Sequence, residues 1–234
     1  MQRMHERIVH NDIHIIEGSV PILLSAPHAG VILKNGKNKH EPRVGTIVRR
    51  LCRDLGTWGV FVTPERLLPR WKEELYPVYK EVVRDIIRTQ RIALFIDIHG
   101  AQRSFPFWID YDFLAPPERL HEMYRQRVGK EHVPPQAHAL DDILETIIQK
   151  NFERHFPNPQ KPLTKSYLRS RNGFGRATLA YRMRKRFGMP TLQLEINRKL
   201  RDDKELFGQT MAFLADTIQE YKSVLHYENT PPRV

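Results

Sequence analysis

Short apolar runs along the chain alternate with segments in which apolar residues recur every three or four positions. The apolar runs predict strands at residues 22–24, 59–63, 92–96, 105–109 and 191–198. The three-and-four spacing predicts amphipathic helices at residues 44–55, 78–90, 118–128, 141–156, 177–187 and 205–225. Because strands alternate with helices, the pattern predicts an α/β fold with a mainly parallel mixed sheet and helices on both faces. We expect one domain over residues 1–234, with a frayed tail from about residue 226.

Two further segments have weaker patterns. Residues 8–16 alternate enough for an edge strand or hairpin arm, with Gly18 and Ser19 as its turn. His10 and His14 would share one face of that strand, which we interpret as an exposed edge rather than a metal pair. Residues 34–39 are rich in Gly, Asn and Lys and predict a surface loop.

Polar residues stand at the ends of several predicted strands. The apolar run 92–96 ends in Asp97 and His99, which project to the same face if the strand continues. His28 follows an earlier strand, and Glu195 interrupts a later one. In an open α/β sheet, the ligand crevice lies at the carboxyl ends of the strands. Each histidine alone could be a packed core residue, but the agreement of three strand ends predicts a shared site.

Two imidazoles and one carboxylate form a common zinc ligand set, with a water in the fourth position. His28 and His99 are the candidate imidazoles. Glu41, just before the helix expected near Val44, lies on the crevice side and is the candidate third ligand. A solvent-facing glutamate at a helix start is the alternative for Glu41. Asp97 is expected outside the ligand set, accepting a ring N–H from one of the histidines. One Zn²⁺ per chain is the expected cofactor.

Four short motifs carry a resemblance to a known family. They are P-H-A-G at 27–30, D-I-H-G at 97–100, N-G-F-G-R at 172–176 and L-Q-L-E-I-N-R at 192–198. In this order they resemble the N-formylglutamate amidohydrolase family, over roughly residues 20–215. The resemblance implies a three-layer α/β/α fold of the phosphorylase/hydrolase type, related to zinc carboxypeptidases and aspartoacylases. It also implies a zinc-bound water that attacks an amide, with His28 and His99 similar to metal ligands and Glu195 similar to the general base.

The chain departs from the family pattern at two places. The related carboxypeptidases have a glutamate three residues after the first histidine, where this chain has Val31. The carboxylate ligand is therefore expected from elsewhere, which is the reason for choosing Glu41. The family's Asn-Arg pair is also missing after strand 59–63, where Arg66 or Arg70 is the candidate replacement. The formylglutamate substrate is not inherited with the fold.

A substrate that combines an amide with a carboxylate requires a cationic clamp, and arginine suits bidentate recognition of a carboxylate. Arginines flank the glycine-rich loop at 172–175, and further polar residues follow Glu195. The candidate substrate-binding residues are Arg70, Arg171, Arg176, Asn197 and Arg198. The expected substrate is a small carboxylate-bearing amide such as an N-acyl amino acid or a short peptide.

Charge adds an alternative function. The chain has 38 Lys and Arg against 27 Asp and Glu, a net charge of +11, which favours acidic partners. A basic nucleic-acid-binding protein that uses residues 169–186 is therefore one alternative, although the sequence lacks a recognition helix, a zinc finger and an aromatic stacking motif. A degenerate hydrolase fold that serves as a binding module is the other.

The remaining composition limits the cellular context. No apolar run approaches the roughly 20 residues that span a bilayer, and no secretory signal is recognisable, so a cytoplasmic protein without a membrane partner is expected. The single cysteine, Cys52, excludes an intramolecular disulfide and is expected to be an inert apolar residue.

Overall fold

The computed structural model describes residues 5–10, 12–34, 37–63, 67–68, 74–113, 136–166 and 178–228. Its main sheet has eight strands, in the spatial order β1 (Glu6–Val9), β2 (Ile13–Ile16), β6 (Thr57–Val62), β3 (Val20–Ala26), β8 (Leu94–Ala101), β11 (Thr191–Asn197), β9 (Ile109–Asp112) and β10 (Leu163–Lys165). The four central strands, β6, β3, β8 and β11, are parallel neighbours. Strands β2 and β9 pair antiparallel to them on either side.

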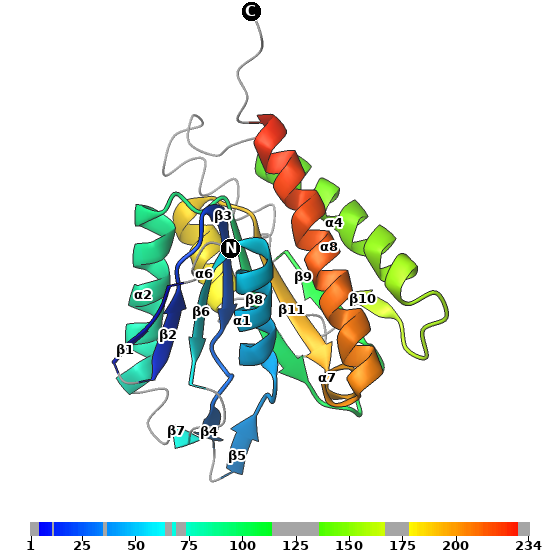
Figure 1. The fold of residues 1–234 in the computed structure, drawn as a ribbon, viewed down its shortest axis with the longest axis horizontal. Helices are drawn as coiled ribbons and strands as arrows, with labels where there is room; N and C mark the ends of the chain where they lie inside the picture. Colours follow the sequence, from blue (N-terminus) through cyan, green and yellow to red (C-terminus); the bar gives the residue numbers. More distant parts are fainter. Residues whose placement is uncertain are drawn as a thin grey trace, which may run out of the picture.

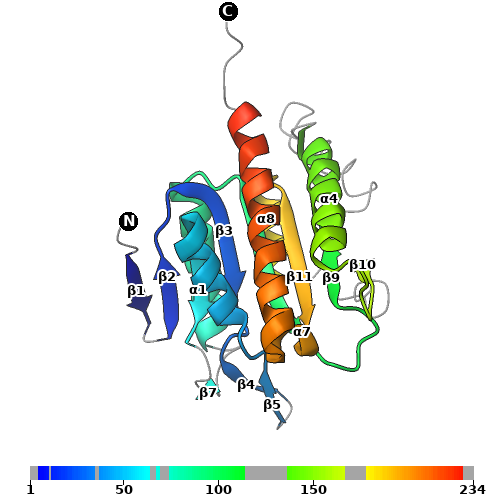
Figure 2. The same cartoon turned by 45° about the vertical axis from the view of Figure 1, so that its right-hand side comes forward.

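Helices cover both faces of this sheet (Figure 1). One face carries α1 (Val44–Leu55), α4 (Gln136–His155) and α8 (Lys204–Glu228), and the other carries α2 (Tyr76–Thr89) and α6 (Leu179–Phe187). Figure 2 shows α1 and α8 lying side by side in front of the central strands. The short helix α7 (Arg198–Asp202) joins β11 to α8. The predicted α/β fold with a mainly parallel mixed sheet is confirmed.

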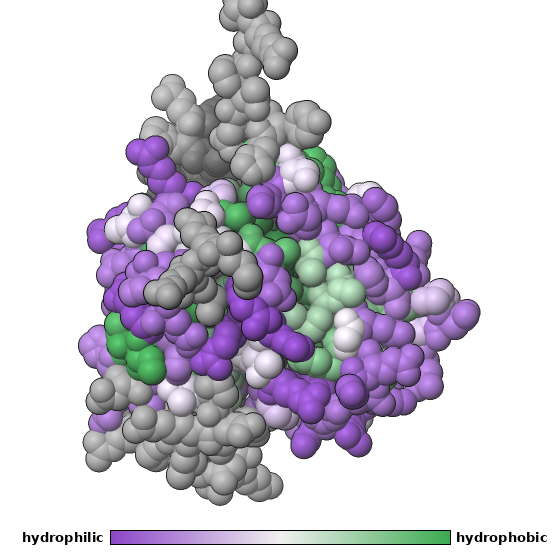
Figure 3. All heavy atoms as spheres, in the orientation of Figure 1, coloured by the Kyte–Doolittle hydropathy of each residue, from purple (hydrophilic) through white to green (hydrophobic). Residues whose placement is uncertain are grey.

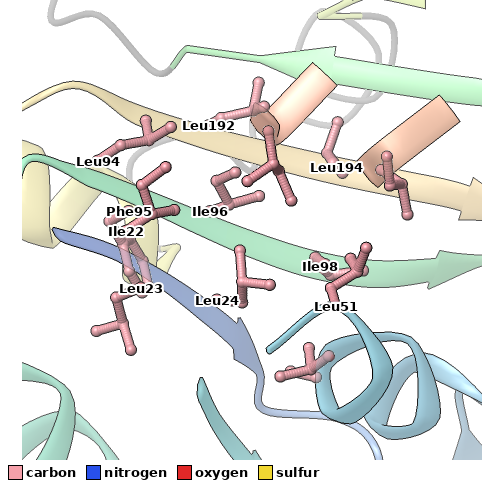
Figure 4. Packing of buried hydrophobic residues seen from close by; sticks show 14 of the residues in the cluster. Ile22, Leu23, Leu24, Leu51, Leu94, Phe95, Ile96, Ile98, Leu192 and Leu194 are labelled. Carbon is pink, nitrogen blue, oxygen red and sulfur yellow. The ribbon is translucent and has the colours of Figure 1, made fainter. Parts of the chain in front are cut away.

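Alternation along the central strands separates an apolar face from a polar one. Leu24, Ile96 and Leu194 are buried on the face that α1 and α8 cover, and Leu51 of α1 belongs to the same hydrophobic cluster (Figure 4). The intervening residues of β8, including Asp97 and His99, project to the face that α2 covers. The hydrophobic core thus fixes the orientation of the polar residues.

The outer surface is largely hydrophilic in the view of Figure 3, with a small hydrophobic area over the middle of α8. In the part of the chain that the structure describes, no helix combines the length and the apolar character needed to cross a membrane.

The N-terminal segment forms two antiparallel strands, β1 and β2, instead of one arm, with a turn at His10 (φ 50°). Strand β1 is the edge, so the expected exposure of His14 was wrong. His14 is 7% exposed, stacks on Phe61 with ring centroids 4.8 Å apart, and contacts Glu6 Oε1 at 2.7 Å. Strand β2 pairs with β1 on one side and with β6 on the other, so it lies inside the sheet.

The expected loop at 34–39 was also wrong. Strands β4 (Val31–Lys34) and β5 (Lys37–His40) pair antiparallel, and β7 (Leu67–Leu68) joins β4 to complete a three-stranded sheet. The sequence between β4 and β5 is Asn-Gly, a dipeptide that favours tight hairpin turns.

Most helix boundaries agree with the spacing of apolar residues. Helices α1 and α6 end at Gly56 (φ 71°) and Gly188 (φ 65°), both left-handed C-caps. The strand expected at 105–109 begins only at Ile109, because the carbonyls of Phe105 and Phe107 accept from the side chains of Lys161 and Asn197 instead of from a neighbouring strand. The helix expected at 118–128 and residues 229–234 of the expected tail lie outside the described residues. Residues 226–228, also expected in the frayed tail, belong to α8 instead.

Candidate functional site

A row of polar side chains crosses the carboxyl ends of the central strands, on the face covered by α2. Strand β8 continues through Asp97 and His99, so both point to this face. The parallel register of β11 and β8 places Glu195 beside His99, and the antiparallel register of β9 places Asp110 beside Glu195. Residues on three neighbouring strands therefore meet at one level of the sheet.

Glu41 joins two histidines at this edge. His28 lies in the turn after β3, Glu41 lies between β5 and α1, and His99 lies on β8. His28 Nδ1 is 3.1 Å from Glu41 Oε1, and His99 Nδ1 is 3.6 Å from Glu41 Oε2. The candidate ligand atoms of the three residues all lie within 4.8 Å of one another. The structure thus brings together the three residues that the sequence suggested as metal ligands.

Two further contacts orient this group. His99 Nε2 lies 3.2 Å from Oδ2 of the fully buried Asp97, and its Nδ1 faces Glu41. A neutral ring that donates from Nε2 to Asp97 leaves the Nδ1 lone pair for a metal ion. The backbone N–H of Gly100 donates to Glu41 Oε2 at 2.9 Å. Two imidazole nitrogens and one oriented carboxylate fit the ligand preferences of a divalent zinc ion.

The charges of the site favour a cation among its carboxylates. Burial alone would lower the pKa of His99. The carboxylates of Asp97, Glu41 and Glu195 together have the larger effect and hold that pKa well above its usual value. Burial raises the pKa of Glu41, but the charges of His28 and His99 hold it well below its usual range. A positive charge among these groups, on an imidazole or as a metal ion, is therefore electrostatically favoured.

The pKa of Glu195 is raised, in contrast to that of Glu41. Burial raises the pKa of its carboxyl to about 7, and Glu41 and Asp110 add to the rise, whereas His99 lowers it. Gln193 Nε2 donates to Glu195 Oε1 at 3.1 Å and fixes the orientation of the carboxyl group. A carboxyl group with this pKa can exchange a proton near neutral pH.

The two candidate substrate contacts that follow Glu195 are engaged within the protein. Asn197 is fully buried; its Nδ2 donates to three carbonyls of the loop 102–107, and its Oδ1 accepts from the backbone N–H of Lys199. These contacts assign Asn197 to the support of that loop and to the cap of α7. The Arg198 side chain is 55% exposed and donates to Asp202 Oδ2 at 3.1 Å.

The other candidate substrate-binding arginines, Arg70, Arg171 and Arg176, lie outside the described residues. In contrast, no motif in the sequence singles out Arg201, which is 1% exposed and lies against Gly100 of β8, directly behind the site. The only sequence signal is the glycine after His99, because Gly100 leaves room for the Arg201 guanidinium. Residue types alone do not reveal that an arginine after a strand turns inward.

The same fold occurs in several solved structures. A gene product of Agrobacterium tumefaciens superposes with a TM-score of 0.59, covering 92% of this chain and 96% of the other at 11% identity. An N-formylglutamate amidohydrolase from Ralstonia eutropha gives 0.55, covering 92% and 98% at 10% identity. The chain shares the fold of this amidohydrolase. A bacteriophage poly-γ-glutamate hydrolase gives 0.50, covering 93% of each chain at 14% identity.

No family sequence model matches the chain, and no curated protein sequence matches it. The superposition on the amidohydrolase structure confirms, at the level of the fold, the resemblance that the four motifs indicated.

Proposed function

We propose that the protein is a zinc-dependent amidohydrolase that cleaves an amide of a small carboxylate-bearing substrate, such as an N-acyl amino acid or a short peptide. The observation that carries this proposal is the convergence of His28, Glu41 and His99, whose candidate ligand atoms lie within 4.8 Å of one another, with Glu195 on the adjacent strand. The shared fold with an N-formylglutamate amidohydrolase and a poly-γ-glutamate hydrolase is consistent with amide hydrolysis.

In this proposal His28, Glu41 and His99 hold the ion. When bound, a zinc ion polarises a substrate carbonyl and lowers the pKa of a coordinated water to about 7. Asp97 keeps the His99 ring in the tautomer that leaves Nδ1 free to bind, and the Gly100 N–H keeps the Glu41 carboxylate turned toward the histidines.

Glu195 is the proposed general base. Its raised pKa and its place beside His99 support this role. The Glu195 carboxylate takes a proton from the attacking water as the new C–O bond forms. It then gives that proton to the amide nitrogen as the C–N bond breaks, which releases the amine.

The carboxylate of the substrate needs a cationic partner. We retain Arg70, Arg171 and Arg176 as the proposed contacts, because an arginine fork recognises a carboxylate through two parallel hydrogen bonds. The net charge of +11 also supports an anionic substrate.

The test combines metal analysis with a substrate screen. The wild-type chain is expected to bind one zinc ion and to release amine from an N-acyl amino acid or short peptide, whereas His28→Ala and His99→Ala lose the metal. Glu195→Gln is expected to keep the metal and lose about 10²- to 10⁴-fold in turnover. His5→Ala, at a side chain that is 68% exposed, is the matched control and should behave as wild type.

Two results would overturn these assignments. A folded wild-type protein that takes up no zinc from zinc-supplemented buffer would exclude the metal-dependent reaction. Full turnover in Glu195→Gln would remove Glu195 as the base while leaving the metal assignment intact.

A further inference from the structure

Arg201 is one of the largest fully buried side chains of the described residues, with 1% of its surface exposed. It lies in α7, immediately after the strand that carries Glu195. No carboxylate in the described part of the chain lies within ion-pair distance of its guanidinium. A buried guanidinium is unfavourable unless its donors are satisfied. The contacts that satisfy it therefore deserve a functional explanation.

All three guanidinium nitrogens donate to backbone carbonyls. Nε donates to Ile196 O at 3.1 Å, Nη2 donates to Ala101 O at 3.0 Å, and Nη1 donates to Pro42 O. These acceptors come from three segments that are far apart in the sequence.

Each acceptor lies within two residues of a member of the candidate site. Pro42 follows Glu41, Ile196 follows Glu195, and Ala101 lies two residues after His99. One rigid, planar group thus connects the backbones that carry a proposed ligand, a second proposed ligand and the proposed base.

Two neighbouring features strengthen the connection. A Cβ on Gly100 would lie 2.6 Å from the central carbon of the guanidinium, so the glycine permits the close approach of Arg201 to β8. The Arg43 side chain donates to the backbone carbonyl of Arg201 at 2.6 Å, which forms a second link to the segment of Glu41.

We propose that Arg201 is a positioning residue that sets the separation of Glu41, His99 and Glu195, and thereby the zinc affinity of the site and the alignment of the base. This inference rests on the proposed function. Metal ligands tolerate small displacements poorly, and loss of the groups that orient them typically costs 10- to 100-fold in metal affinity. The fork geometry of arginine is essential, because a lysine ammonium keeps the charge but carries its three donors on one nitrogen and cannot span the carbonyls that Nε, Nη1 and Nη2 reach separately.

The main experiment compares Arg201→Lys with Arg184→Lys in the full-length chain. Arg184 is the matched control, because it is also buried (5% exposed) but pairs with Asp141 and with Phe113 O near the opposite end of β11. Folding is checked by circular dichroism, and the Zn²⁺ dissociation constant is measured by chelator competition well below the unfolding temperature. Arg201→Lys is expected to weaken Zn²⁺ binding about 10- to 100-fold and to lower kcat. Arg184→Lys should leave the dissociation constant unchanged.

Gly100→Ala and Arg43→Ala provide independent perturbations. The first pushes the guanidinium away from β8 and should weaken Zn²⁺ binding as Arg201→Lys does. The second removes an exposed side chain and is expected to fold in any case, with a several-fold weaker Zn²⁺ affinity. It keeps the inference testable if the buried variants do not fold.

The outcomes separate the inference from the proposed function. If the wild type binds Zn²⁺ and the folded Arg201→Lys and Arg43→Ala variants bind it equally well, the positioning role is excluded and the proposed function stands. Equal weakening in Arg184→Lys would also overturn it, because the effect would then be general instability. If the wild type binds no Zn²⁺, the proposed function fails and the inference fails with it.

Discussion

Cys52 allows a test of the packing at the scale of one residue. It lies on α1, and its sulfur faces Gly59 of β6 so closely that a Cβ there would lie 2.5 Å from Sγ. Burial raises the pKa of the thiol to about 12. Because the thiolate is the nucleophile, native Cys52 is expected to be unreactive toward a disulfide reagent at pH 8. The measurement is thiol release before and after unfolding in guanidinium chloride.

One thiol equivalent should react only after unfolding, and a Cys52→Ala variant gives the background. Rapid labelling of the native protein, with the circular dichroism spectrum unchanged, would contradict the packing of α1 on β6.

Individual residues of the candidate site differ in how far the sequence could predict them. The proximity of His28 and His99 could be predicted, because both follow apolar runs and the carboxyl ends of parallel strands share one edge. The inward turn of Arg201 could not, because its acceptors are carbonyls from three distant segments. The same reason explains Asn197, whose polar side chain suggested a substrate contact but is enclosed by the loop 102–107.

At the scale of the elements, Asn197 is expected to be structural. It holds the loop between β8 and β9 through three carbonyls and caps α7. Asn197→Ala removes the side-chain donor of Gln102 O and Phe107 O and the cap of α7, and should lower the free energy of unfolding by about 2–3 kcal/mol. The adjacent Arg198→Ala removes only an exposed ion pair and should change it by less than about 1 kcal/mol. Urea unfolding of both variants measures the difference.

A destabilised Asn197→Ala protein with an unchanged KM would separate loop support from substrate contact. Unchanged stability and a raised KM in Asn197→Ala would contradict the structural role and would indicate that Asn197 contacts the substrate.

The elements themselves were predictable where one periodicity dominates. Both ends of helix α1 were predictable, because its apolar stripe begins at Val44 and stops at Leu55, directly before the C-cap Gly56. Strand β5 was missed because its residues, Lys37–His40, are polar and have the composition of a loop. Strand β4 was missed although Val31, Ile32 and Leu33 are apolar, because a run of three residues is too short to indicate a strand by itself. Strand β9 begins later than expected, because the side chains of Lys161 and Asn197 donate to the carbonyls of Phe105 and Phe107. Propensity does not register such tertiary contacts.

At the scale of the whole molecule, alternation of strands and helices predicted the parallel centre of the sheet but not its strand order. The order places β3, β8 and β11 side by side although about 70 residues separate β3 from β8 and about 90 separate β8 from β11. Connections of this length satisfy many topologies, and the choice among them depends on the packing of α1 and α8 on one face and α2 and α6 on the other.

This topology makes the proposed metal a cross-link of the fold. His28, Glu41 and His99 come from three segments, so zinc bound to them would restrain the turn after β3, the approach to α1 and the end of β8 together. A ligand that binds only the folded chain stabilises it by mass action, by about 4 kcal/mol when free zinc is roughly 1,000-fold above the dissociation constant. The zinc-loaded protein should therefore unfold at a higher temperature than the same protein after treatment with a chelator.

The matched control is His99→Ala, in which the ligand set is broken and the chelator should have no effect on the unfolding temperature. His5→Ala retains the set and should respond as the wild type does. If the chelator shifts wild type and His99→Ala equally, zinc binds elsewhere on the chain, and the assignment of the ion to this edge of the sheet is wrong. A shift confined to proteins that retain both histidines ties the stability of the three segments to the site that they form.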